Sequence, residues 1–297
     1  MEMSEAERKV WRRLPAGAAE AIAGLSGSQL QTLLLAVARD RAGRVRPADL
    51  VRRWRQDRFV RPAAADPRAV SRAEARLWEL LPPDVYGTQL SPVVPLGTVT
   101  AVAPLSQNRI VTATRPVEVL SDPTNALAIE AAARRDTSDE VHVAAAHQVL
   151  RAQVFGPGLG SHFRLFALVS SARDTGSGRT EARLLARHLA YWRQVLAPLA
   201  RARVRYTIFD SPVLRERIAE LASPLLVEEP ERDRGRGYYT GAALRITAGD
   251  VELGDGGFTT WTAQMRADAK ERCLISCVSV DRLQSLAMPS SATVSQR

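Results

Sequence analysis

The sequence predicts an α+β protein in which helices flank a mostly antiparallel sheet and a small helical module comes first. From residue 92 onward, short β-branched runs alternate with helical stretches without a regular strand–helix period, which is typical of antiparallel sheets. Residues 182–199 carry apolar side chains at helical spacing, and the strand-like run 204–210 follows them. Residues 1 to about 80 show helical spacing throughout.

The helical module has recognisable end signals. Ser26 to Ser28 can cap its second helix, and Gly43 can end it. A fourth helix is expected to begin at Ser71, after a proline-containing connector over residues 60–68. We therefore divide the chain into three parts, which are a helical module (1–82), an α+β core (83–287) and a tail expected to be disordered (288–297).

Composition limits the class of protein. A chain of 297 residues, 45% of them hydrophobic, can bury a substantial core in one large and one small domain. It has no apolar run long enough to span a bilayer, and residues 1–5 are too polar for a signal peptide. The two cysteines and four histidines lack zinc spacing, so Cys273 and Cys277 are expected to be reduced core residues of a cytoplasmic protein.

The net charge of +9 comes almost entirely from arginine, since the only lysines are Lys9 and Lys270. Arginines around Trp54 could contact a phosphate backbone, and a solvated helix face explains them equally simply. A high-GC genome also produces arginine in place of lysine. RNA binding is therefore an open alternative that the composition does not favour, and no membrane partner is expected.

The stretch Val149–Asp174 carries the most chemical information. Arg151 ends one apolar run, the glycine-rich loop FGPGLGS follows, and a second apolar run opens with His162 and has Phe166 four residues later. Arginine can hold a phosphate through charge-assisted bonds, and an aromatic ring can stack on a base. The pattern predicts a nucleotide site on an antiparallel hairpin, because the chain has neither a P-loop nor a dinucleotide-binding glycine motif.

This hairpin resembles motif 2 of the class II aminoacyl-tRNA synthetases, in particular the histidyl-tRNA synthetase core and its tRNA-independent paralogues. Leu274–Leu283 resembles motif 3, whose helix begins with an arginine that contacts the γ-phosphate of ATP; Arg282 matches it. Ser279 stands where the family usually has a glycine. The run 90–98 lies where motif 1 supplies the dimer interface, so a homodimer is expected.

Two further segments resemble the part of the family that binds the amino acid. Arg234–Ile246 is similar to the RGLDYYT signature, which implies an activating role for Arg234 and pocket roles for Tyr238 and Tyr239. The run 251–261 is similar to the GGRYD strand, with Gly256 and Gly257 retained for substrate binding. Gly237 replaces the family's aspartate, and Phe-Thr-Thr replaces Arg-Tyr-Asp, so a substrate other than histidine is expected.

Residues 118–135 resemble the segment in which a strand ends and a helix begins at the substrate's α-amino group. Asp122 and Thr124 can cap that helix, and Asp122 is the candidate for gripping the amino group. The resemblance covers roughly residues 83–287, with the motifs in the family's order. It implies a class II synthetase-like fold, with ATP and Mg²⁺ as cofactors and an amino acid or related carboxylate as substrate.

The resemblance assigns roles to the remaining candidates. It implies that Arg151 binds the α-phosphate and the carboxylate, that Gln153 meets the adenine amino group, and that His162 meets the β- and γ-phosphates. Phe166 would stack on adenine, and Glu252 would bind Mg²⁺. Taken alone, Phe166 is equally a core residue, His162 a loop-end residue and Glu252 a solvated strand residue. Of the two adjacent tyrosines, one should face the core and the other the pocket.

Three functions remain open at this stage. The first is an ATP-dependent ligase that adenylates a carboxylate and transfers it to a carrier protein, a protein or a small molecule. The second is a non-catalytic paralogue that senses an amino acid or supports a partner enzyme. The third is an RNA- or tRNA-acting module. Because no anticodon-binding domain follows residue 287 and no insertion domain separates motif 2 from Arg234, ordinary tRNA charging is not expected. The three retained arginines favour the ligase.

Overall fold

The computed structural model describes residues 3–103, 105–156, 160–209, 211–221, 223–232 and 234–287. The centre of the predicted glycine-rich loop, Pro157–Leu159, and the tail 288–297 lie outside these residues. Helices of the described chain are α1 (Glu5–Trp11), α2 (Ala18–Ala23), α3 (Gly27–Gly43), α4 (Pro47–Gln56), α5 (Pro67–Glu79), α6 (Thr98–Val102), the 3-10 helix η1 (Gln107–Arg109), α7 (Pro123–Arg134), α8 (Arg179–Leu196), α9 (Pro212–Ala219), α10 (Trp261–Arg266) and α11 (Val280–Ala287).

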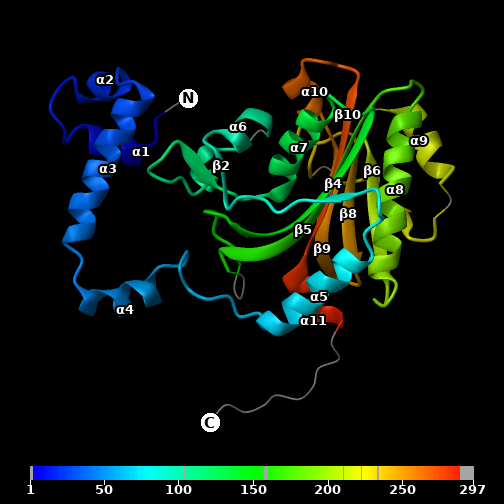
Figure 1. Ribbon diagram of the computed structural model, residues 1–297. Helices are drawn as coiled ribbons and strands as arrows, with labels where there is room; N and C mark the ends of the chain where they lie inside the picture. The colour runs from blue at the N-terminus through cyan, green and yellow to red at the C-terminus, as the bar shows by residue number, and fades with distance from the viewer. Residues whose placement is uncertain are drawn as a thin grey trace, which may run out of the picture.

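The strands of the described chain form one large sheet and one small one (Figure 1). They are β1 (Tyr86–Gly87), β2 (Val93–Pro95), β3 (Val117–Val119), β4 (Glu140–Leu150), β5 (His162–Arg173), β6 (Ala202–Ile208), β7 (Leu226–Glu228), β8 (Thr240–Ala248), β9 (Val251–Thr259) and β10 (Glu271–Ser279). The large sheet has the order β1-β4-β5-β10-β9-β8-β6-β7. Only its two edge pairs, β1 with β4 and β6 with β7, are parallel. The mostly antiparallel sheet predicted from the sequence is therefore confirmed.

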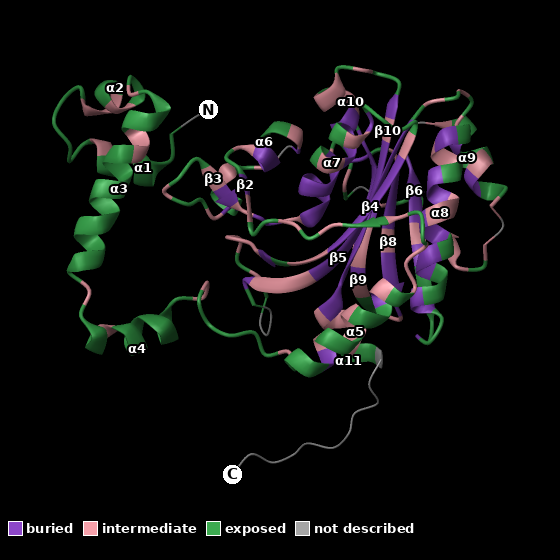
Figure 2. Ribbon diagram, viewed as in Figure 1, coloured by how far each residue is buried: buried purple, intermediate pink, exposed green. Residues whose placement is uncertain are grey.

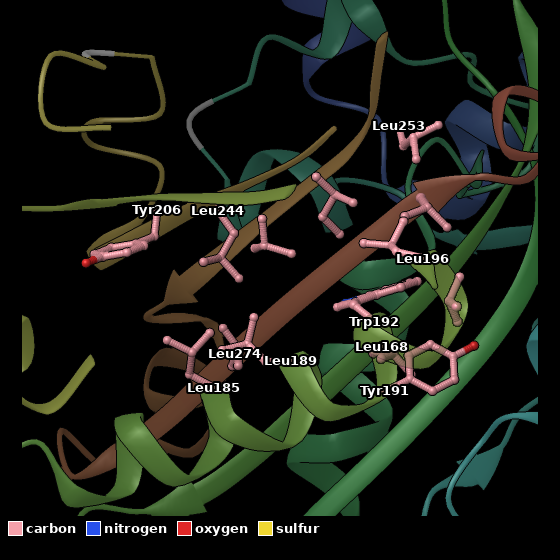
Figure 3. Packing of buried hydrophobic residues seen from close by; sticks show 14 of the residues in the cluster. Leu168, Leu185, Leu189, Tyr191, Trp192, Leu196, Tyr206, Leu244, Leu253 and Leu274 are labelled. Carbon is pink, nitrogen blue, oxygen red and sulfur yellow. The ribbon is translucent and has the colours of Figure 1, made fainter. Parts of the chain in front are cut away.

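Alternate residues of the central strands supply two separate cores, one on each face of the sheet. On β5, Phe166 and Leu168 face the core that α8, α5 and α11 cover, where Tyr191, Trp192 and Leu196 are buried (Figure 3). The intervening residues of β5 belong to the second core, which α7 and α10 cover. This strict alternation decides which side chains can reach a site on the α7 face.

The helices α1 to α4 contain no buried residue and lie to one side of the sheet in Figure 2, where they are mostly green. Their capping signals work as expected, because Ser26 accepts the backbone N–H of Gln29 at the start of α3. By contrast α5 packs on the sheet body through Leu77, which is 1% exposed. The boundary at residue 82 remains a prediction.

Strands β8 and β9 form a hairpin that turns at Gly249, whose φ is +58°. The fourth helix does not begin at Ser71: Asp66 caps it by accepting the Arg68 N–H, and Pro67 is its first residue. Proline is well suited to that position because its missing N–H would have no partner there. No helix of the described residues is long and apolar enough to cross a membrane.

Candidate functional site

Two adjoining cavities share part of their lining, and the smaller opens on the α7 side of the sheet. The smaller, about 270 Å³, is lined by residues of α7, β9 and β10 and by the segment before β8. The larger, about 730 Å³, is lined by the β4–β5 hairpin, by β9 and by the junction of β10 with α11. Their linings share Arg151, Gln153, Arg234, Asp255 and Cys277. A molecule in one cavity can therefore meet a molecule in the other at these residues.

The expected pair Asp122 and Arg151 does come together. Asp122 is the N-cap of α7, and its Oδ1 accepts the N–H of Thr124 at 3.0 Å and the hydroxyl of Thr124 at 2.7 Å. Arg151 donates from Nε to the Ser121 carbonyl at 2.8 Å and from Nη2 to Asp122 Oδ2 at 3.2 Å. The cap therefore holds the Asp122 carboxylate in place, and that carboxylate orients the Arg151 guanidinium at the junction of the cavities.

Arg282 lines the larger cavity at the start of α11. Its Nη1 donates to the Glu252 carbonyl at 2.7 Å, which ties the helix start to β9. Arg234 is mostly exposed, lines both cavities, and approaches Glu252 Oε2 at 3.5 Å. The three arginines named from the sequence thus border one connected space. Gln153 and Thr124 also line it, and so does Ser279.

Asp255 is a site residue that the sequence analysis missed. It lies on β9 opposite Cys277 of β10, and the Cys277 Sγ is 3.8 Å from Asp255 Oδ1. Burial raises the pKa of Asp255, the nearby Asp122 charge raises it further, and Arg151 lowers it. A carboxylate held in this way is stabilised by an added cation. The feature of the sequence that could have identified it is an acidic residue inside an otherwise glycine-rich, buried strand.

The two tyrosines of the segment before β8 both line the smaller cavity. Tyr239 is 6% exposed and Tyr238 is half-buried, but both pack in the same core cluster and both line the cavity, so the predicted division into one core residue and one pocket residue is wrong. Their rings meet edge to face at 4.8 Å, and Tyr238 contacts Trp261 in the same way. Burial raises the pKa of both phenols well above the usual value, so both hydroxyls stay protonated.

Gly256 and Gly257 were expected to bind substrate, and the structure corrects this. Neither is among the residues that line these two cavities. A Cβ on Gly257, at φ +153°, would lie 2.6 Å from Tyr239 Cδ1, and one on Gly256 would lie 2.8 Å from Ser276 Cα. Gly257 therefore leaves room for the Tyr239 ring. Gly256 allows close packing against Ser276 on the other face of the sheet.

Phe166 was expected to stack on adenine, and the structure corrects this too. Its side chain is 0% exposed, and it packs between Trp78 and Tyr191 on the far face of the sheet. Phe163, three residues earlier and on the site face, lines the larger cavity instead. The Arg151 guanidinium lies 5.2 Å from the Phe163 ring centre, and Phe155 contacts that ring edge to face. The period-2 alternation of β5 was the available signal.

His162 borders the larger cavity, but both ring nitrogens are already bonded. Nδ1 pairs with Gln148 Nε2 at 2.8 Å, and Nε2 pairs with the Arg61 carbonyl at 2.7 Å. The ring is satisfied when Nε2 donates and Nδ1 accepts. In this conformation His162 therefore holds the connector before α5 rather than offering a donor to a phosphate.

The same connector is anchored by Arg58. Its guanidinium donates to the carbonyls of Ala152 and Gln153 and to the Ser161 hydroxyl, all in the β4–β5 hairpin. Residues 63–65 of the connector line the larger cavity. No sequence signal pointed to this contact, since Arg58 and Gln153 are 95 residues apart.

Glu252 fits a limited role in holding Mg²⁺. It is a half-buried carboxylate on the wall of the larger cavity. The described residues contain no group of three acidic, histidine or cysteine side chains that could hold a metal. Since Mg²⁺ is commonly held by one or two carboxylates together with substrate phosphates, Glu252 fits as one protein ligand of a nucleotide-bound ion.

No family model and no curated protein sequence matches the chain. Solved structures do match. An ATP phosphoribosyltransferase regulatory subunit/histidyl-tRNA synthetase from Bacillus halodurans has a TM-score of 0.61 at 11% identity, covering 78% of this chain and 83% of that one. The apo S. aureus histidyl-tRNA synthetase has a TM-score of 0.56 at 13% identity, covering 77% of this chain and 67% of that one.

A third similar structure is pyrrolysyl-tRNA synthetase from Desulfitobacterium hafniense, with a TM-score of 0.51 at 13% identity, covering 84% of this chain and 79% of that one. At such identities the similarity concerns the fold. The chain therefore has a class II synthetase-like fold, as expected from its motifs, and its function has to be argued from the site.

Proposed function

We propose that the protein is an ATP-dependent ligase that adenylates an α-amino acid and passes it to an acceptor other than ordinary tRNA. The observation that carries this proposal is the pair of adjoining cavities with Arg151 and Asp255 in both linings. The smaller suits an amino acid, since its 270 Å³ lies just below the 300–1,000 Å³ usual for drug-sized ligands. The larger, with Phe163, Arg282 and Glu252, suits ATP.

The charges around the smaller cavity match a zwitterion. Asp255 and Asp122 would receive the α-amino group; Asp255 suits this best because both oxygens of Asp122 already accept hydrogen bonds. An ammonium group beside Asp255 would offset the burial and repulsion that raise the pKa of its carboxyl. Arg151 would hold the substrate carboxylate between the two cavities.

In the proposed reaction a carboxylate oxygen attacks the α-phosphorus of ATP, and the bond from that phosphorus to the β-phosphate oxygen breaks. Acyl-adenylate and pyrophosphate are the products. Arg151 would neutralise charge at the α-phosphate, Arg282 would hold the γ-phosphate, and Arg234 would stabilise the crowded transition state. Bound Mg²⁺ would neutralise phosphate charge, with Glu252 as its protein ligand. Positioning and charge stabilisation account for the catalysis.

A second function, a nucleotide-independent amino-acid sensor, is favoured by one observation. The connector contacts the β4–β5 hairpin at the larger cavity through Arg58 and His162, so these two side chains bond to other residues of the protein and not to a nucleotide. A sensor would keep the smaller cavity and have no need to bind ATP. The proposed enzyme acts as a homodimer.

The deciding experiment is calorimetric ATP binding with Mg²⁺, followed by amino-acid-dependent exchange of pyrophosphate into ATP. We expect micromolar binding that Arg282→Ala weakens at least about 10-fold, since a hydrogen bond to a charged group contributes roughly 1.5–3 kcal/mol. Arg193→Ala, an exposed arginine on α8, is the matched control and should bind ATP normally. Amino-acid binding without any ATP binding would refute the ligase and support the sensor.

A further inference from the structure

Asn125 is a buried polar residue of the smaller cavity with no role so far. It lies in the first turn of α7, is 1% exposed, and is one of the residues that line the cavity. Its Nδ2 has no hydrogen-bond acceptor among the described residues. A buried amide nitrogen without an acceptor costs roughly 1–3 kcal/mol, so a ligand that supplies one would be stabilised by the exchange.

Part of the wall of this cavity is apolar. Val99, Ile110 and Ile275 line the same cavity and belong, with residues of α7, to one core cluster. Of the charged lining residues, Asp122, Asp255, Arg151 and Arg234 already have roles at the amino-acid backbone or at phosphates, and Arg109 is exposed. Among the uncharged polar residues of the described lining, Asn125 is the one whose side chain has a buried donor without an acceptor.

Arg232 is the other lining residue with an unpaired buried donor, its Nη1. Its Nε donates to the Arg234 carbonyl at 3.0 Å, which places it beside an arginine that both cavities share. We therefore group Arg232 with the arginines that would face the phosphates and the carboxylate of the reactants. We do not assign it to the substrate side chain.

We propose that Asn125 determines substrate specificity, and that the substrate is an α-amino acid whose side chain ends in an uncharged carboxamide. This inference rests on the proposed function, because it assumes that the smaller cavity holds the amino acid. A carboxamide oxygen accepts from Asn125 Nδ2, while its NH₂ can donate to Asn125 Oδ1. A carboxylate could only accept, and it would lose its hydration against the apolar part of the wall. An apolar side chain would leave the amide unpaired.

Discrimination of this kind is strong when a buried polar group of the protein is left without its partner. We expect glutamine or asparagine to bind at least about 10-fold more tightly than glutamate, methionine or leucine. Asn125→Asp keeps the shape and removes the donor, and it should weaken carboxamide binding about 10- to 100-fold. Asn125→Leu should shift the preference to methionine or leucine.

The test is direct binding of these five amino acids, by calorimetry and by the rise in melting temperature, with pyrophosphate exchange measured in parallel. Asn108→Asp, the same change at an exposed asparagine, is the matched control and should bind as the wild type does. Both Asn125 variants are first compared with wild type by circular dichroism. If Asn125→Asp does not fold, Asn125→Leu and the wild-type panel still decide the question.

The possible results separate the two proposals. Carboxamide binding that Asn125→Asp weakens, without pyrophosphate exchange, supports the specificity assignment and refutes the ligase. Exchange with methionine or glutamate that equals or exceeds exchange with glutamine and asparagine supports the ligase and overturns the assignment. Binding of none of the five amino acids by the wild-type protein also overturns it.

Discussion

Replacing Phe163 and Phe166 separately by alanine tests whether Phe163, rather than Phe166, contributes to nucleotide binding. The two residues are three positions apart on β5 and face opposite sides of the sheet. Phe163 lines the larger cavity beside Arg151, whereas Phe166 is 0% exposed against Trp78 and Tyr191. One change should therefore affect nucleotide binding, and the other the folding of the chain.

The expected magnitudes follow from these surroundings. Removing a fully buried phenylalanine costs about 3–5 kcal/mol, which corresponds to a fall in melting temperature of roughly 5–8 °C for a chain of this size. Removing an aromatic ring that stacks on a base costs about 1–3 kcal/mol of binding, or roughly 5- to 150-fold in ATP affinity. Since Phe163 is only partly buried, its loss should change the melting temperature much less than the loss of Phe166.

The assays are thermal unfolding by circular dichroism and ATP titration by calorimetry on both variants. Phe163→Tyr keeps the ring and should retain most of the affinity, which separates stacking from a general disturbance of the hairpin. The reasoning is refuted if Phe166→Ala loses ATP binding while its melting temperature is unchanged, or if Phe163→Ala binds ATP as the wild type does.

Three further predictions concern other contacts. Burial lowers the pKa of His142 to about 4 and the pKa of His188 to about 3, so below pH 6.5 the unfolded chain binds protons at these histidines that the folded chain does not bind. The free energy of unfolding in urea should therefore be about 2 kcal/mol lower per histidine at pH 5 than at pH 7.5. A free energy of unfolding that does not change between these pH values would contradict this. Arg58→Ala frees the connector from the hairpin and should increase proteolysis near residue 60 several-fold; equal cleavage of variant and wild type would argue against the anchor. Glu271→Gln breaks a buried, two-bond pair with Arg135 and should cost about 3–5 kcal/mol in the same urea assay, whereas a loss below 1 kcal/mol would show that the pair contributes little.

Much of the fold could be predicted because its signals are local. Helix caps such as Ser26 and Asp122, and the turn at Gly249, depend on residues a few positions apart. The motifs also placed Arg151 and Arg282 at one connected space, since each stands at the end of a recognisable strand. Motif spacing pointed to Phe166, whereas the alternation of β5 places Phe163 at the cavity.

The sequence by itself determined the class of fold, the alternation of each strand and the identity of the arginines that border the cavities, because these follow from periodicity and local motifs. Only the tertiary structure decided which face of the sheet carries the site, since that depends on which helices cover each side. It also decided that Asp255 pairs across strands with Cys277, that Asn125 stays unpaired at the cavity wall, and that Arg58 reaches the hairpin. Such contacts join residues far apart in the chain, and cross-strand register and long-range packing set them without a local signal.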